Sequence, residues 1–135
     1  MKVLVDTCVW SLALNSDGSK NKAIRNELEL LIDENRVLMI GPIRQEILSA
    51  YKDEKKFNVI AKNLSYFPST IIDDNDYVIA AKFHNLCRSK GIQGSHIDFL
   101  ICSIASRLDS AIFTVDKDFS SFKKHLPILL HDLSF

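Results

Sequence analysis

The sequence has no net charge and no long hydrophobic run, and each of these absences narrows the classes of function to be considered. Seventeen basic and seventeen acidic side chains cancel among 135 residues. No global field therefore marks the chain as a nucleic-acid binder, although a bound metal or a local patch would reverse that conclusion. No apolar run approaches the roughly 20 residues of a membrane-spanning helix, and the start lacks the basic-then-apolar pattern of a secretory signal. We therefore expect a cytoplasmic protein without a membrane partner.

The few cysteines and glycines exclude several further kinds of site. Cys8, Cys87 and Cys102 are odd in number and widely spaced, which predicts reduced core thiols rather than zinc ligands or redox pairs. Gly91 and Gly94 flank a turn instead of following a strand, so there is no glycine-rich phosphate loop. No Ser-His-Asp order indicates a nucleophilic triad, and Cys8 lacks a sequence sign of a paired base.

What the sequence does contain is an alternation of short apolar runs and amphipathic segments. Its 47% hydrophobic and 25% charged residues are typical of a globular protein, and its length predicts one domain, residues 1–135. We expect strands at 2–5, 36–40, 70–72, 111–115 and 128–131. We expect helices at 9–14, 20–34 (capped by Ser19 after a turn at 15–19), 42–50, 57–64, 73–90, 95–108 and 117–125. This alternation predicts an α/β fold with a mostly parallel central sheet of about five strands flanked by helices.

Four acidic residues from separate segments are expected at one edge of this sheet. Asp6 ends the first strand and Asp116 ends the strand at 111–115, and ligands bind at the carboxyl ends of strands in open α/β sheets. Glu46 lies early in the helix that follows Pro42. Asp98 lies in the first turn of the helix that starts at Ser95.

Each acid also has a purely structural interpretation. Asp6 and Asp116 suit helix caps, and Glu46 suits the positive end of a helix dipole. Asp98 suits a capping box with Ser95. The coincidence of all four favours a site, because converging carboxylates repel one another unless a cation lies between them. An all-oxygen site suits Mg²⁺ or Mn²⁺, and such ions are natural partners of phosphodiester chemistry.

The segments around these acids carry a more specific pattern: residues 5–10 (VDTCVW), Glu46 after Pro42, residues 96–105 (HIDFLICSIA) and residues 113–119 (FTVDKDF). In this order, across essentially the full chain, they resemble the motifs of PIN-domain ribonucleases, and most of all those of the small VapC-type toxins of type II toxin-antitoxin pairs. The resemblance implies an Mg²⁺- or Mn²⁺-dependent endoribonuclease that cuts RNA. The residues it assigns to catalysis and metal binding are Asp6, Glu46, Asp98 and Asp116. It also implies a homodimer, and an antitoxin whose tail blocks the site.

Two positions near the acids depart from that pattern or complicate it. Cys8 stands where such proteins usually have Ser or Asn, so we expect a weaker polar contact behind Asp6. Asp118 is a fifth acid, two residues after Asp116. The sequence leaves open which of these two reaches the metal directly, and Asp116 is preferred because it falls at the strand end after Thr114.

Auxiliary roles are expected for a few neighbours of the acids. Thr7 and Thr114 could each orient a carboxylate by a hydrogen bond, or could simply be β-branched residues beside a strand. Arg44 and Lys117 flank two of the acids and are placed to contact RNA phosphates, unless they are merely solvated. His96 is a weaker candidate for a phosphate contact, since a histidine in the first turn of a helix is usually solvated.

Two alternative functions stay open. One is a housekeeping RNA-processing nuclease of the same type, which the sequence does not distinguish from a toxin. The other is a non-catalytic phosphate-sensing or phosphoacceptor module, with a pocket built from Asp73, Asp74, Thr114 and Lys117. That module needs paired acids near the first strand, where Asp6 stands alone. The acids at 73–76 are explained more simply by the dipole of the helix they begin.

Overall fold

A parallel sheet forms the centre of the computed structural model, which describes residues 1–15 and 21–133. Within these residues there are four strands, β1 (Val3–Val5), β2 (Val37–Leu38), β3 (Ala111–Phe113) and β4 (Leu129–Leu130), in the order β2-β1-β3-β4. β1 pairs in parallel with both neighbours, so that Leu4 lies opposite Leu38 and Ile112. The carboxyl ends of the strands therefore share one edge, as the predicted α/β class requires.

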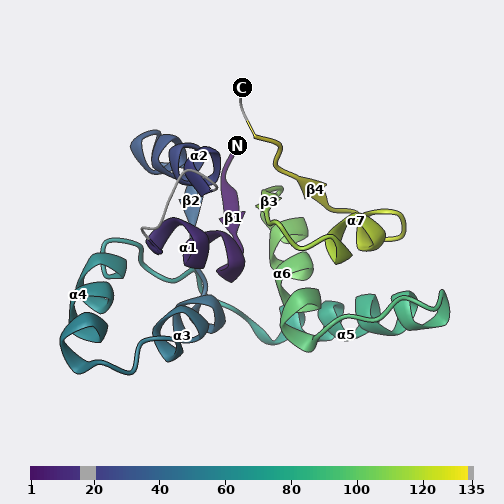
Figure 1. Cartoon of the computed structure of the whole chain (residues 1–135). Helices are drawn as coiled ribbons and strands as arrows, with labels where there is room; N and C mark the ends of the chain where they lie inside the picture. The colour runs from purple at the N-terminus through teal and green to yellow at the C-terminus, as the bar shows by residue number, and fades with distance from the viewer. Residues whose placement is uncertain (16–20, 134–135) are drawn as a thin grey trace.

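Seven helices connect and cover the strands in the described part of the chain. They are α1 (Thr7–Leu14), α2 (Lys22–Asp33), α3 (Gly41–Ser49), α4 (Glu54–Leu64), α5 (Asp74–Ser89), α6 (His96–Arg107) and α7 (Asp118–Lys123). In Figure 1, α1, α2 and α3 lie on the β2 side of the strands, and α5, α6 and α7 on the β3 side. None of the described helices is long and apolar enough to cross a membrane. The predicted turn at 15–19 and the Ser19 cap lie, apart from Asn15, outside the described residues.

The fifth strand predicted at 70–72 does not form. Instead, Ser69, directly before this segment, forms an isolated parallel bridge with Met39. Thr70 N donates a hydrogen bond to the Met39 carbonyl at 2.8 Å. The prediction relied on the apolar character of the segment, but Ile71 is 84% exposed and contributes nothing to a buried sheet face. The sheet is thus one strand smaller than expected, with its class unchanged.

The strand predicted at 111–115 is also shorter, because its last two residues bond to side chains rather than to a neighbouring strand. The Thr114 hydroxyl donates to the Asp6 carboxylate, and Val115 N donates to the Cys8 sulfur. The chain after Phe113 therefore turns across the end of β1.

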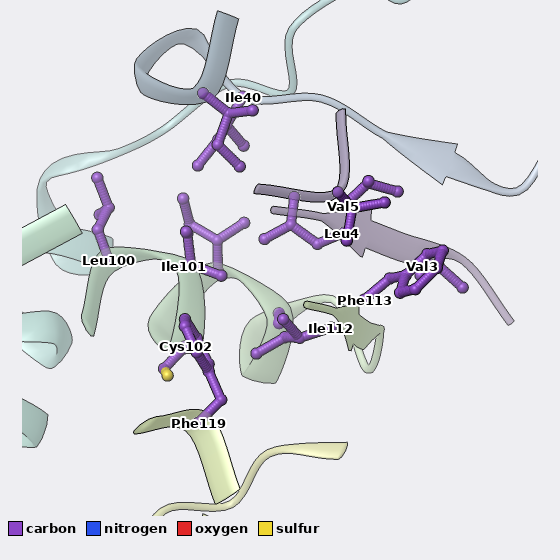
Figure 2. Packing of buried hydrophobic residues seen from close by; sticks show 14 of the residues in the cluster. Val3, Leu4, Val5, Ile40, Leu100, Ile101, Cys102, Ile112, Phe113 and Phe119 are labelled. Atoms are coloured by element: carbon purple, nitrogen blue, oxygen red, sulfur yellow. The ribbon is translucent and has the colours of Figure 1, made fainter. Parts of the chain in front are cut away.

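The hydrophobic core is centred on α6. Seven consecutive residues of this helix, from Phe99 to Ala105, are buried. Figure 2 shows Leu4, Ile101 and Ile112 gathered between β1, α6 and β3. A helix that is apolar around its circumference is buried on all sides. This packing holds the first turn of α6, which carries Asp98, in a fixed relation to the sheet.

Gly94 lies in the turn before α6, at a point where no side chain fits. A Cβ atom there would lie 2.6 Å from Cζ of Phe122 and 3.0 Å from the ring of Phe99. The Phe99 and Phe122 rings themselves pack with centroids 4.8 Å apart. The close approach of this backbone to two rings sets the direction in which the chain enters α6.

An ion pair joins α5 to α6. Asp76 is 2% exposed and accepts hydrogen bonds from Arg107 Nε at 2.7 Å and Nη2 at 2.9 Å. It also forms a capping box with Asp73 at the start of α5. The hydrogen bonds from the Arg107 guanidinium hold the pKa of Asp76 below its usual range. The acids at 73–76 therefore serve the start of the helix, where the sequence analysis placed them, and Asp76 also forms an interhelical pair that the sequence did not predict.

Candidate active site

Asp6 stands at the junction of β1 and α1, where both of its carboxylate oxygens accept hydrogen bonds. Oδ1 accepts from Thr7 N at 2.8 Å, which makes Asp6 the N-cap of α1. Oδ2 accepts from Thr114 Oγ1 at 2.9 Å and from the Cys8 thiol at 3.5 Å. An ionised carboxylate has about four acceptor positions, so these bonds leave capacity for a further ligand. Capping and ligand binding by Asp6 are therefore compatible.

Thr114 connects Asp6 to the loop that carries Asp116. Its hydroxyl donates to Asp6 Oδ2 and accepts from Asp116 N at 3.0 Å. Asp116 Oδ1 in turn accepts from Asp118 N at 2.9 Å, which begins the turn into α7. The orienting hydrogen bond expected of Thr114 is therefore present, while its effect on activity stays a prediction.

Asp98 occupies the first turn of α6 and forms the predicted capping box with Ser95. Its Oδ2 accepts from Ser95 N at 3.1 Å, and its own N–H donates to Ser95 Oγ at 3.1 Å. Burial is the main cause that raises the pKa of Asp98, and the charges of Asp6 and Asp116 raise it further. Asp98 thus lies close enough to Asp6 and to Asp116 to be repelled by both charges.

Glu46 reaches the same edge from α3 through a contact with α1. Its Oε1 accepts a hydrogen bond from Thr7 Oγ1 at 2.9 Å. Because Thr7 directly follows Asp6, this bond ties Glu46 to the end of β1. The side chain of Glu46 is exposed, so it lies at the solvent side of the acidic edge formed by Asp6, Glu46, Asp98 and Asp116.

The acidic edge offers oxygen ligands only. Among residues 1–15 and 21–133, no group of three or more His, Cys, Asp or Glu side chains has an arrangement that could hold a metal ion. Mg²⁺ usually takes one or two protein carboxylates and keeps several of its waters, so it does not need such a cage. Asp6 and Asp98, with Asp116 beside them, fit that preference, whereas a structural zinc ion takes four protein ligands of the Cys and His type.

The family of this chain follows from a comparison with known proteins. The family model of the PIN domain matches residues 3–125. The chain belongs to the PIN-domain family. Among curated proteins, VapC ribonuclease Mb1587 of Mycobacterium bovis and ribonuclease VapC11 of Mycobacterium tuberculosis are each 31% identical to it over 121 residues, which covers 87% of this chain and 88% of each relative. The resemblance seen in the sequence is confirmed.

Solved structures share the architecture of this PIN domain. VapBC2 from Rickettsia felis, bound to a DNA fragment from its promoter, superposes with a TM-score of 0.78 at 19% identity, covering 99% of this chain and 100% of that chain. FitAcB from Neisseria gonorrhoeae gives a TM-score of 0.77 at 20% identity and 96% coverage of both chains. At these identities the similarity establishes the fold.

The two basic residues predicted to contact RNA differ in their surroundings in this PIN domain. Arg44 donates to the carbonyls of Leu64, at 2.9 Å, and Phe67, and to Ser69 Oγ at 3.2 Å. It therefore ties α3 to the end of α4, and an RNA contact by Arg44 stays a prediction beside this structural role. Lys117 is exposed directly after Asp116, in a position open to a phosphate.

The contacts of Cys8 with the loop after β3 were not foreseen from the sequence. Its sulfur accepts from Val115 N and lies 3.5 Å from Thr114 Oγ1, although these residues are more than a hundred positions away. Burial raises the pKa of the Cys8 thiol. A thiol is a weak donor, so Thr114 supplies the stronger hydrogen bond to Asp6 Oδ2, which agrees with the weaker contact expected of Cys8.

Proposed function

We propose that this PIN domain, residues 1–135, is a divalent-metal-dependent endoribonuclease and the toxin of a type II toxin-antitoxin pair. The observation that carries the proposal is the convergence of Asp6, Asp98 and Asp116, where burial and mutual repulsion raise the pKa of Asp98. A cation at that point would offset the repulsion. The relatives named as VapC ribonucleases support RNA as the substrate. A housekeeping RNA-processing nuclease is the alternative use of the same chemistry.

The residues of the acidic edge have different proposed roles in binding the metal and in positioning its ligands. When bound, Mg²⁺ or Mn²⁺ supplies an activated water and stabilises charge on the phosphate. Asp6 and Asp98 are the proposed direct ligands, with Asp116 and Glu46 completing the edge and Asp118 beside it. Thr114 and Thr7 hold Asp6 and Glu46 in place through their hydroxyls.

The proposed partners are RNA, an antitoxin and a second copy of the chain. Lys117 and Arg44 are the candidates for phosphate contacts. The solved structures with a similar fold include VapBC2 and FitAcB, which supports an antitoxin partner for this chain. A small antitoxin gene directly beside this one would separate the toxin from a housekeeping nuclease.

Incubation of the purified protein with total cellular RNA, with and without Mn²⁺, tests the proposed activity. We expect discrete new RNA ends in Mn²⁺ and none in EDTA. Mapping these ends identifies the RNA that is cut and the position of the cut. Intact RNA under both conditions, or equal degradation under both, would refute the metal-dependent nuclease.

Metal should also stabilise the fold, because a ligand that binds only the native state adds to its stability by linkage. A metal concentration of 100 times the Kd contributes about 2.7 kcal/mol, which corresponds to a rise in Tm of roughly 10 °C for a domain of this size. Thermal melts in EDTA, MgCl₂ and MnCl₂ at matched ionic strength measure this rise in Tm. The rise should disappear in Asp98→Asn, and an unchanged wild-type Tm at millimolar metal would contradict the metal site.

Thr114→Val should lower metal-dependent cleavage by roughly 10- to 100-fold, the usual cost of losing a group that orients a metal ligand. The substitution removes the bond to Asp6 Oδ2 and the acceptor for Asp116 N while keeping the β-branched shape. Initial rates across a range of Mn²⁺ concentrations measure it. Thr114→Ser keeps the hydroxyl and should restore most of the rate; equal rates for the Val and Ser variants would show that the hydroxyl does not matter.

A further inference from the structure

The contact between α1 and α3 that holds Glu46 continues along both helices to a polar pocket (Figure 1). At its start, Thr7 Oγ1 of α1 donates to Glu46 Oε1 of α3 at 2.9 Å. Four residues further along each segment, Ser11 and Ala50 both line a pocket of about 410 Å³. Residues four apart lie on the same face of a helix, about 6 Å apart along its axis. The pocket therefore lies on the same faces of α1 and α3 as the Thr7–Glu46 contact, about one helical turn from it.

The wall of this pocket is polar and carries an excess of positive charge. Besides Ser11 and Ala50, it contains Asn15, Tyr51, Lys52, Asp53 and Lys56. Among the described residues of the wall, Asp53 is the one acid, and its carboxylate accepts from Lys56 N at 3.0 Å as the N-cap of α4. Neither Lys52 nor Lys56 forms a salt bridge with an acid in the described part of the chain. Both ammonium groups are therefore available to an anion.

An aromatic ring positions one of these two ammonium groups. Lys56 Nζ lies 5.4 Å from the centroid of the Tyr51 ring, and Tyr51 itself is half-buried against the hydrophobic core. A cation–π contact attracts the ammonium group without neutralising its charge. On the other side of the pocket, Arg25 of α2 donates to the carbonyl of Asn15 at 3.0 Å, which adds a further cation behind the wall. The positive charge of this pocket is thus partly held in place by its surroundings.

We propose that this pocket binds a backbone phosphate of the RNA substrate, a few nucleotides from the phosphate that is cut. The inference rests on the proposed function, since it takes the acidic edge as the place of the cut. Lysine ammonium groups bind phosphates and fix the position of a strand without reading its sequence. A strand advances about 3.4 Å per nucleotide when stacked, so about two nucleotides cover the helical turn between Glu46 and the pocket. The continuity of the α1–α3 contact from the acids to the lysines favours one RNA strand over a separate acidic peptide.

Binding of a short single-stranded RNA in EDTA tests the pocket without cleavage. The double variant Lys52→Gln/Lys56→Gln should raise Kd roughly tenfold at low salt, the usual effect of losing a hydrogen bond to a charged group. The slope of log K against log salt concentration should become shallower by about 0.7 for each phosphate contact that is lost. Fluorescence anisotropy across a range of NaCl concentrations measures both quantities.

The matched control is Lys55→Gln/Lys62→Gln, which removes the same charge from two exposed lysines of α4 outside the pocket wall. Its Kd should stay within about twofold of the wild-type value, because salt screens exposed charges that do not touch the ligand. In Mn²⁺, the Lys52→Gln/Lys56→Gln variant should raise KM and leave kcat nearly unchanged, as expected for a contact that is equally strong before and during the reaction.

Neutral methylphosphonate linkages, introduced one at a time into an RNA whose cut has been mapped, locate the contacted phosphate. One such linkage, a few nucleotides from the cut, should weaken binding by the wild type. The same linkage should have little effect on binding by Lys52→Gln/Lys56→Gln, because the two changes remove the same interaction. Equal effects of every linkage on both proteins would refute a phosphate contact by these lysines.

The possible failures are distinguishable. If the wild type cuts no RNA in Mn²⁺, the proposed nuclease function is wrong, and the binding data in EDTA still decide whether the pocket holds a phosphate. If the wild type cuts RNA but the two double variants bind it equally well, only the pocket assignment is wrong. Unchanged RNA binding by Lys52→Gln/Lys56→Gln, together with loss of binding to the cognate antitoxin, would assign the pocket to a protein interface and overturn the phosphate proposal.

Discussion

Asp98→Asn should reduce metal-dependent RNA cleavage by at least about 100-fold while the protein remains folded. An asparagine keeps an oxygen acceptor for Ser95 N, so the capping box at the start of α6 survives. It removes the charge that would hold the cation. Groups that merely orient a metal ligand contribute roughly 10- to 100-fold, so loss of a direct ligand should cost more. Initial rates of RNA cleavage in Mn²⁺ measure the effect.

Asp74→Asn is the matched control, because Asp74 is an exposed acid in the first turn of another helix. It should cleave RNA at the wild-type rate. Wild-type activity in Asp98→Asn would refute the assignment of Asp98. The pair Asp116→Asn and Asp118→Asn then identifies the acid that the loop after β3 contributes to the metal site, since only the loss of that acid should lower cleavage.

The variant Asp98→Asn also tests the electrostatics of the acidic edge in the absence of metal. Because the pKa of Asp98 is raised in the folded protein, its ionised form opposes folding at neutral pH. In EDTA at pH 7, Asp98→Asn should therefore melt at or above the wild-type temperature. As the pH falls through the raised pKa, the wild-type carboxyl takes up its proton and this difference should vanish. A variant less stable than the wild type at every pH would mean that the charge is already compensated.

Arg107→Met should destabilise the fold by about 2 kcal/mol. Removing one partner of a fully buried ion pair costs roughly 3–5 kcal/mol because the other charge is left without compensation. Here Asp76 is 2% exposed but the Arg107 side chain is 37% exposed, so water recovers part of that cost. Urea or thermal unfolding measures the change. Arg88→Met, at the exposed end of α5, is the control and should change stability by less than about 0.5 kcal/mol.

The pH dependence separates the charge from simple packing. The pKa of Asp76 is lowered in the folded protein, so this group stabilises the fold above its ordinary pKa of about 3.9 and loses that effect as the pH falls through the lowered value. Wild type and Arg107→Met should therefore differ most at neutral pH and converge in acid. A difference that stays constant down to pH 2 would assign the effect to the lost packing of the arginine stem.

Local signals in the sequence were sufficient for much of this protein. The capping box of Ser95 and Asp98 predicts the start of α6, and the polar ends of two apolar runs predict Asp6 and Asp116 at one edge of a parallel sheet. These features depend on residues a few positions apart, and short-range geometry decides them. The segment at 70–72 shows the limit, because apolar composition does not reveal whether a segment meets a sheet face, and Ile71 meets none.

The sequence by itself determined the α/β class, through the periodicity of its apolar residues, and it carried the motifs whose resemblance pointed to the PIN-domain family and to the candidate acids. Only the tertiary structure decided which oxygens are engaged, because the bonds of Thr114 and Cys8 to Asp6 depend on how β3 packs beside β1. Packing also turned Arg44 toward the carbonyls of Leu64 and Phe67, and it placed Ser11 in one pocket with Ala50 and Lys56. These contacts join residues far apart in the chain, and local preferences carry no information about such distances.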